Sequence, residues 1–153
     1  MTLNTASATI SFARKLEEDS GRFYEGLASK HGQESAYASF AEANRQFIAR
    51  VEQAYYEVIS DALEGTFAFS IDPASYDLSP VLVDRPHAEA LDGAIAMEAK
   101  IGQFYSQAAE QSRPFMAEVA RAFSTVARKR EERREKLEGM RSSLSGEQAN
   151  KKA

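Results

Sequence analysis

The chain has 153 residues, of which 43% are hydrophobic and 27% are charged, and its net charge is -4. This length and composition predict one folded domain with a single substantial core, and they exclude global disorder. The negative charge argues against nucleic acid as a partner, and the absence of cysteine excludes disulfides, thiolate metal sites and cysteine nucleophiles.

The beginning of the chain shows no sign of export. The stretch MTLNTASATISFARKLEE lacks the continuous apolar core of a signal peptide, and no apolar run in the sequence is long enough to cross a bilayer. We therefore expect a cytoplasmic protein that has no membrane partner.

Hydrophobic residues recur every third or fourth position and predict four helices, at about residues 5–31, 33–64, 88–111 and 113–140. Thr5 can cap the first helix, Gly32 can end it, and Pro114 falls in the first turn of the last. Residues 65–87 hold three of the four prolines and read as a crossover along a bundle. The prediction is an all-α four-helix bundle over residues 1–141, built from two antiparallel helical hairpins, followed by a polar tail at 142–153 that is frayed or disordered.

The first and third predicted helices each place one glutamate in an apolar stripe. Glu17 and Glu98 lie 81 positions apart, and each is followed six and seven residues later by Phe-Tyr. The stripes read Ile10, Ala13, Glu17, Ser20, Tyr24, Leu27, His31 and Leu91, Ala94, Glu98, Ile101, Tyr105, Ala108, Ser112. A carboxylate on such a stripe faces the core, where it needs a partner. The match indicates a duplicated hairpin with a polar centre.

The second and fourth predicted helices also match each other. Aligned positions are Phe40/Phe123, Ala43/Val126, Phe47/Arg130, Arg50/Arg133 and Ala54/Leu137. This alignment places Arg50, Arg130 and Arg133 on inner faces. The basic run from Arg128 to Arg134 could contact a phosphate, although the interspersed Glu131 and Glu132 favour an ion-paired surface.

Over roughly residues 8–140 the chain resembles the rubrerythrin-type branch of the ferritin-like family. The resemblance implies a centre of two iron or manganese ions, held by one Glu from each of two helices and a Glu-x-x-His from each of the other two. Glu17 and Glu98 match the first pair of positions. The remaining family positions fall on residues without a suitable donor, namely Phe47, Arg50, Arg130 and Arg133.

These replacements change the expected chemistry of the centre. Phenylalanine has no donor atom, and arginine stays protonated and offers no lone pair. We therefore expect no metal and no other cofactor. Instead, the expected site is a buried ion-pair cluster of Glu17, Glu98, Arg50, Arg130 and Arg133, since the planar guanidinium suits contact with carboxylates.

Two function classes remain open. The first is a non-catalytic ferritin-like protein that acts as a structural or protein-interaction module, with an unidentified protein partner or as a homodimer. The family pairs subunits along helical faces, and Tyr55, Tyr56, Phe67 and Phe69 are the residues expected to be exposed for that contact. The second is a rubrerythrin-like diiron or dimanganese oxidoreductase of peroxide or oxygen chemistry, which would use Glu17, Glu98 and a rearranged set of carboxylates.

Overall fold

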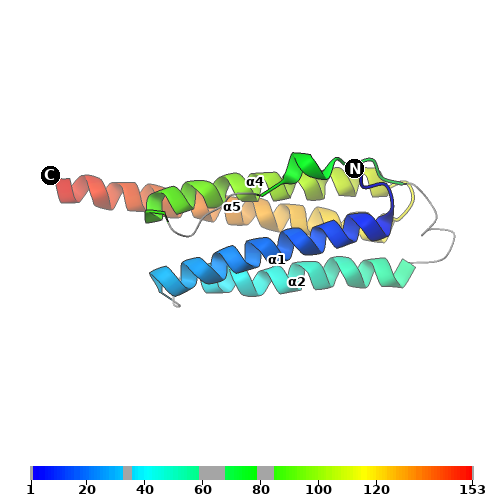
Figure 1. Ribbon diagram of the computed structural model, residues 1–153, viewed down its shortest axis with the longest axis horizontal. Coiled ribbons are helices and arrows are strands. Elements are labelled where there is room, and N and C mark those ends of the chain that lie inside the picture. Colours follow the sequence, from blue (N-terminus) through cyan, green and yellow to red (C-terminus); the bar gives the residue numbers. More distant parts are fainter. Residues whose placement is uncertain (1, 33–35, 59–67, 79–84, 153) are drawn as a thin grey trace.

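Four long helices pack side by side in the computed structural model, which describes residues 2–32, 36–58, 68–78 and 85–152, with side chains as far as residue 144. They are α1 (Ala6–His31), α2 (Ala36–Val58), α4 (His87–Ser112) and α5 (Ala117–Lys152), and a short 3-10 helix, η1 (Pro73–Tyr76), precedes α4. The members of each hairpin run antiparallel, whereas α2 and α4 run parallel (Figure 1). The predicted all-α four-helix bundle of two antiparallel hairpins is confirmed.

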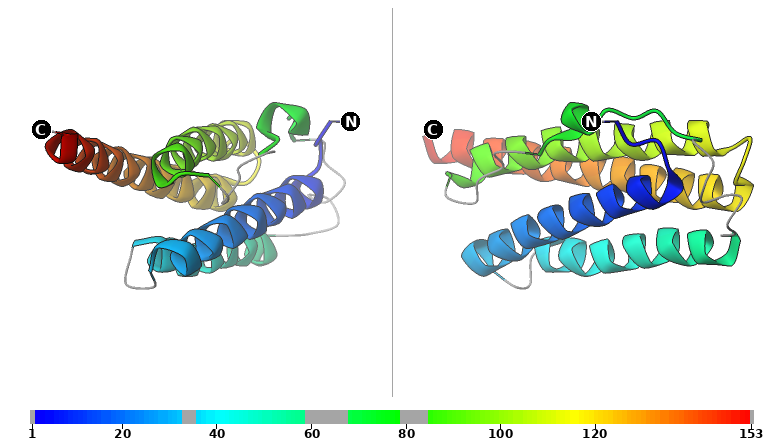
Figure 2. Two further views of the ribbon diagram at one scale, coloured as in Figure 1. Left: turned by 60° about the vertical axis from the view of Figure 1, so that its left-hand side comes forward. Right: turned by 45° about the vertical axis from the view of Figure 1, so that its right-hand side comes forward.

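The two hairpins form the two halves of the bundle. Helices α1 and α2 lie together on one side, and α4 and α5 lie together on the other (Figure 2). Apolar side chains from both halves meet in one core, and its largest fully buried members include Leu16, Tyr24, Ile101, Phe104 and Phe123. None of the helices in the described ranges carries an apolar stretch sufficient to span a membrane.

The ends of α1 follow from its capping residues. The Thr5 hydroxyl oxygen accepts a hydrogen bond from the Ala8 N–H at 3.1 Å, which satisfies one of the free donors of the first turn. Gly32 has a φ of 106°, which a side chain would strain, and its N–H donates to the Ala28 carbonyl. Both predicted ends of the first helix are confirmed.

The ends of α5 differ from the prediction. Pro114 lies in a turn before the helix, where the N–H groups of Phe115 and Met116 both donate to the Ser112 carbonyl, and α5 begins at Ala117. The helix then continues to Lys152, so the predicted end near Met140 and the non-helical tail are wrong. No proline follows Pro114 to stop the helix, and Leu144 still packs against the core. The predicted ends of the second helix, at 33 and 64, lie outside the described residues.

The described part of the crossover, residues 68–78, lies along α4. Phe69, Ile71 and Tyr76 are buried, and Ile71 forms a backbone bridge with Leu3 through hydrogen bonds of 2.7 and 3.0 Å. The Ser70 N–H donates to the Gln111 side chain at 2.8 Å, which fixes the segment against the last turns of α4. Apolar side chains therefore hold this part of the crossover against the bundle.

Two of the residues expected to be exposed for dimer contacts are buried. Tyr55 is 9% exposed because it lies on the inner stripe of α2, and Phe69 is 4% exposed because the crossover folds it onto the core. The prediction that they are available at the surface is wrong. Tyr56 is 67% exposed, and Phe67 lies outside the described residues.

Candidate functional site

The two matched glutamates meet near the middle of the bundle. Glu17 of α1 and Glu98 of α4 are 2% and 1% exposed. The Tyr24 hydroxyl donates to Glu98 Oε2 at 2.7 Å, and the Tyr105 hydroxyl donates to Glu17 Oε1 at 2.7 Å. Each hairpin thus supplies one phenol and one carboxylate to the other, and the 81-residue repeat relates the two bonds.

Arg130 of α5 joins the two carboxylates. Its Nη1 donates to both oxygens of Glu98, at 2.9 and 2.7 Å, and its Nη2 donates to Glu17 Oε2 at 2.6 Å. Nη2 also donates to the Ser20 hydroxyl at 3.0 Å. The guanidinium is completely buried, so the forked contact to Glu98 forms without competition from water.

The electrostatics of the site keep Arg130 and the two tyrosines protonated. Burial disfavours the charged guanidinium of Arg130, but the Glu17 and Glu98 carboxylates outweigh this effect and raise its pKa well above the ordinary value. Burial, followed by the neighbouring carboxylates, raises the pKa of Tyr24 and Tyr105 well above 10. Both phenols therefore remain protonated donors at neutral pH.

Arg133 lies one turn further along α5 and also contacts α2. Its Nη1 donates to Asn44 Oδ1 at 2.7 Å, and its Nη2 donates to the Phe40 carbonyl at 3.0 Å. Its guanidinium carbon lies 4.7 Å from the centre of the Phe40 ring and 5.1 Å from the centres of the Tyr24 and Phe47 rings. Its closest approach to Glu98 is 3.8 Å. Burial and the like charge of Arg130 lower the pKa of Arg133, and Glu98, Tyr24 and Glu17 counteract this in part.

Arg50, the fifth predicted member, does not join the cluster. It is exposed, because the buried face of α2 passes from Phe47 to Val51, a step of four, rather than to Arg50, a step of three. The alignment of α2 with α5 supplies a second reason why Arg50 does not turn inward. Arg133 turns inward onto Asn44, but the position that corresponds to Asn44 on α5 is Ala127, which has no side-chain acceptor.

The remaining four charges balance. Glu17 and Glu98 carry two negative charges, and Arg130 and Arg133 carry two positive ones, all with 4% exposure or less. A fifth charge from Arg50 would have left the buried cluster with a net positive charge, which is costly in a core.

The sequence-based prediction missed two members of the network, Ser20 and Asn44. Asn44 Nδ2 donates to the Ser20 hydroxyl at 2.7 Å and to the Glu17 carbonyl at 3.0 Å. Ser20 stands on the predicted stripe of the first helix, but its small hydroxyl does not by itself indicate a contact. Asn44 lies three residues before Phe47 and seven before Val51, and that spacing was the available signal for its burial.

The site does not fit the di-metal centre that the resemblance implies. All four carboxylate oxygens of Glu17 and Glu98 already accept hydrogen bonds from Arg130, Tyr24 or Tyr105. The Arg130 guanidinium carbon lies 5.4 Å from the centre of the Phe47 ring, so two of the family's ligand positions hold a cation and a benzene ring in contact. In the described parts of the chain, no group of three or more acidic or histidine side chains could hold an ion.

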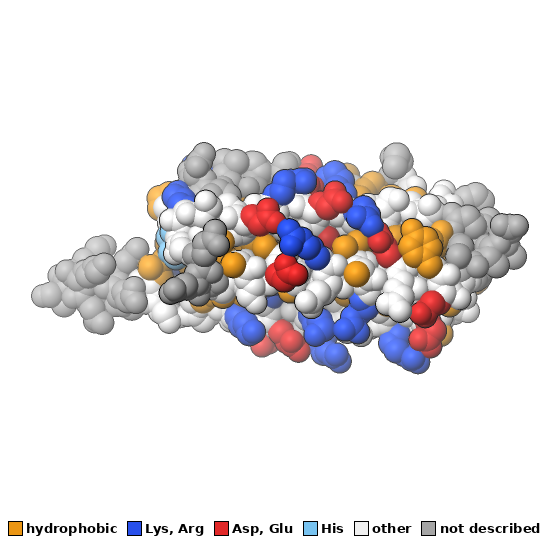
Figure 3. Space-filling model, turned by 90° about the horizontal axis from the view of Figure 1, so that it is seen from below, with side chains coloured by type: hydrophobic (Ala, Val, Ile, Leu, Met, Phe, Trp, Pro, Cys, Tyr) orange, Lys and Arg blue, Asp and Glu red, His pale blue; other side chains and the backbone are white. Residues whose placement is uncertain are grey.

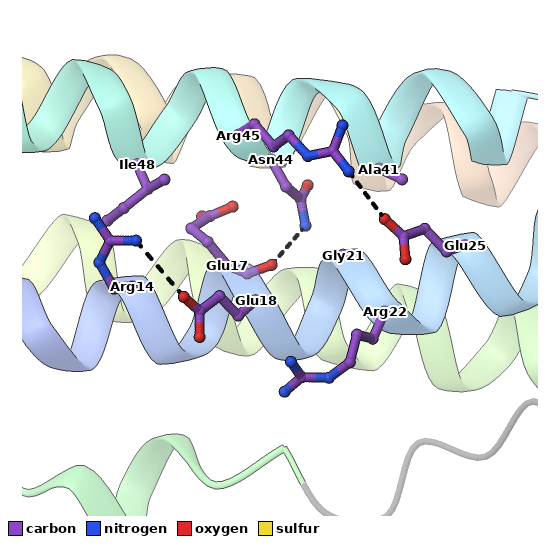
Figure 4. Close-up of a pocket in the computed structure, with 10 residues that line it drawn as sticks. All are labelled: Arg14, Glu17, Glu18, Gly21, Arg22, Glu25, Ala41, Asn44, Arg45 and Ile48. Atoms are coloured by element: carbon purple, nitrogen blue, oxygen red, sulfur yellow. Dashed lines mark hydrogen bonds and ion pairs between the residues drawn. The ribbon is translucent and has the colours of Figure 1, made fainter.

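A surface groove between α1 and α2 lies beside this network. It has a volume of about 410 Å³ and is lined by Gly21, Asn44 and charged side chains (Figure 4). The cations in it are paired, since Arg14 lies 3.6 Å from Glu18 and Arg45 lies 3.4 Å from Glu25. Arg22, the third arginine of the lining, pairs with Asp19, so each arginine of this groove already has a carboxylate partner.

Comparison with known proteins adds no relative. No protein-family model, no curated protein and no solved structure matches the chain. A four-helix bundle hosts many unrelated functions, so the fold alone assigns none. The function has to follow from the geometry of the cluster.

Proposed function

We propose that this chain is a non-catalytic ferritin-like protein, related to rubrerythrins, in which the buried ion-pair cluster replaces the di-metal centre. It serves as a structural or protein-interaction module. One observation carries the proposal: Arg130 lies between Glu17 and Glu98 and donates hydrogen bonds to both. The guanidinium supplies the positive charge that metal ions supply in a metal-binding bundle, and it also stabilises the contact between the hairpins.

The burial of the cluster supports a non-catalytic role. A catalytic acid or base has to come within hydrogen-bonding reach of a substrate. The charged side chains of this cluster are at most 4% exposed, and each carboxylate oxygen already has a donor within the protein. The phenols, whose pKa values are raised, remain protonated and serve as donors to the carboxylates.

The proposed module forms a cytoplasmic homodimer through one end of the bundle. Tyr56, near the end of α2, is 67% exposed, and Phe115, in the turn before α5, is 54% exposed. These two segments lie at the same end of the bundle (Figure 1). Exposed aromatic side chains are enriched at protein interfaces. Light scattering on the parent and on a Tyr56→Ser, Phe115→Ser variant tests this part, and a monomeric parent contradicts it.

Metal analysis tests the central proposal. Protein produced in medium supplemented with iron and manganese is expected to contain far less than one metal ion per chain. A matched sample of an Arg130→Met variant controls for the guanidinium, because that variant exposes the two carboxylates to any available ion. Two ions per chain in the parent would overturn the proposal and favour a diiron or dimanganese oxidoreductase of peroxide or oxygen chemistry.

A further inference from the structure

A second groove, between α2 and α5, has a different charge pattern from the groove between α1 and α2. Its volume is about 210 Å³, and four of its lining residues are cations: Arg50, Lys129, Arg133 and Lys136. Glu132 is the one carboxylate among the lining residues. The charge of Arg133 is balanced within the buried cluster, so the three cations at the rim and Glu132 leave the groove with an excess of two positive charges on a protein whose net charge is -4.

The cations at the rim of this groove have no carboxylate partner among the described residues. Arg50, Lys129 and Lys136 form no ion pair with any side chain in the described part of the chain. Elsewhere on the surface basic and acidic side chains lie beside one another, as on the face shown in Figure 3. Arg45, five residues before Arg50 on the same helix, pairs with Glu25 and Glu42 at 3.4 and 2.9 Å. Cations that line one groove without a carboxylate partner attract an anion more strongly than paired cations do.

The base of the groove is preorganised. Arg133 is 4% exposed, and its guanidinium is held by Asn44 and by the Phe40 carbonyl. The rings of Phe40 and Phe47, each 7% exposed, line the groove beside it. A ligand in the groove would therefore meet the hydrogen-bonded Arg133 at the base, the cations of the rim and the rings of Phe40 and Phe47.

We propose that the groove between α2 and α5 binds the phosphate group of a small molecule, either inorganic phosphate or a phosphate monoester. Arg50 and Lys129 contact the phosphate oxygens from the two sides, and Arg133 forms the base of the groove below them. Arginine and lysine are the side chains that bind phosphate through charge-assisted hydrogen bonds. The volume of the groove fits a small molecule, and the negative charge of the whole protein disfavours a nucleic acid. This proposal goes beyond the structural role of the ion-pair cluster and does not depend on it.

Isothermal titration calorimetry on the full chain tests the proposal, with inorganic phosphate and phenyl phosphate as probes and chloride at matched ionic strength as the reference. Both probes are expected to bind saturably at one site per chain. Tighter binding of phenyl phosphate indicates that the Phe40 and Phe47 rings contact an organic group and that the ligand is a monoester. Equal affinities indicate inorganic phosphate as the ligand.

Surface variants locate the site. Arg50→Gln and Lys129→Gln are each expected to weaken phosphate binding about tenfold, because each removes one charge-assisted hydrogen bond. Glu132→Gln is expected to strengthen binding, since it removes a like charge. Arg45→Gln is the matched control, because it removes the same charge from the same helix but from the other groove, and it is expected to leave the affinity unchanged.

These measurements distinguish binding of phosphate at one defined site from a general attraction of phosphate to positive charge. The proposal is overturned if neither probe binds saturably, or if Arg45→Gln weakens binding as much as Arg50→Gln does. Arg45, Arg50 and Glu132 are exposed and Lys129 is half-buried, so circular dichroism is expected to show parent-like helix content in each variant.

Discussion

Tyr24 and Glu98 form a 2.7 Å hydrogen bond that crosses from the first hairpin to the second, and the 81-residue repeat produces its counterpart between Tyr105 and Glu17. The two bonds have the same length and opposite directions. A single duplicated motif, a glutamate followed by Phe-Tyr, therefore generates both halves of the contact at once. Arg130 breaks the symmetry, because only the second hairpin supplies the buried cation that joins both carboxylates.

The two tyrosines are expected to differ in their contribution to stability. Tyr105 is the one hydrogen-bond donor to Glu17 Oε1 among the described residues, whereas Glu98 Oε2 accepts from both Tyr24 and Arg130. Tyr105→Phe is therefore expected to cost about 1–3 kcal/mol of unfolding free energy, and Tyr24→Phe about 1 kcal/mol. Urea unfolding measures both, with Tyr56→Phe as an exposed control. Equal losses in the two core variants would contradict the hydrogen-bond assignment.

Removal of one carboxylate is expected to destabilise the bundle strongly. Glu98→Ala leaves Arg130 with Glu17 as its one close carboxylate, and it leaves Arg133 without the carboxylate 3.8 Å away. A buried charge without its partner costs roughly 3–5 kcal/mol, which for a chain of this length corresponds to a fall in Tm of roughly 10 °C. Calorimetry on Glu98→Ala and on the exposed control Glu18→Ala provides the comparison. A variant that melts within a degree or two of the parent shows that the network does not hold the fold.

The sequence predicted the polar centre well where a residue interrupts an apolar stripe. Glu17, Glu98, Arg130 and Arg133 each do so, and the structure brings these four together. Arg50 was placed wrongly because helical spacing permits steps of three or four, and the one-residue choice after Phe47 decides whether Arg50 or Val51 faces the core.

Contacts between neighbouring helices explain the other differences between the prediction and the structure. Asn44 accepts from Arg133, but no periodicity in α2 reveals that an arginine on α5 reaches it. The continuation of α5 to Lys152 was also not visible in the sequence, because the polar residues there indicate a tail. The contact of Arg141 with Asp92 at 2.9 Å depends on the packing of α5 against α4. Features that depend on two helices at once are not encoded in the pattern of either one.

We expect the buried Asn44 side chain to contribute strongly to the stability of the fold. Asn44→Ala removes the acceptor of Arg133 and the donor to Ser20 and the Glu17 carbonyl, all of which are buried. The expected loss is about 2–4 kcal/mol, since a hydrogen bond to a charged donor and two neutral bonds are lost together. Chemical denaturation measures this loss against Gln53→Ala, an exposed amide on the same helix. A loss below about 0.5 kcal/mol would show that Arg133 finds another acceptor.

The two histidines stack on each other at the end of the bundle where α1 ends and α4 begins. The ring centres of His31 and His87 lie 3.9 Å apart with an angle of 13° between the planes, and His87 Nε2 lies 2.6 Å from the Tyr37 hydroxyl. Burial lowers the pKa of both rings below 6.5, the charge of His87 adds to the effect on His31, and Lys30 lowers both. Protonation of the pair would bring two positive charges into contact beside a third.

This arrangement predicts a loss of stability on mild acidification. Because the folded-state pKa values lie below 6.5, the unfolded chain binds more protons than the fold as the pH falls towards that value. The histidine contribution is therefore fully present above about pH 7, and it is lost as the pH falls through 6.5 towards the lowered values. The sequence contains two histidines in all, so a His31→Asn, His87→Asn variant removes the whole effect. Melting temperatures between pH 7.5 and 5 are expected to fall less steeply in this variant than in the parent, and parallel curves would show that the stacked pair does not titrate in this range.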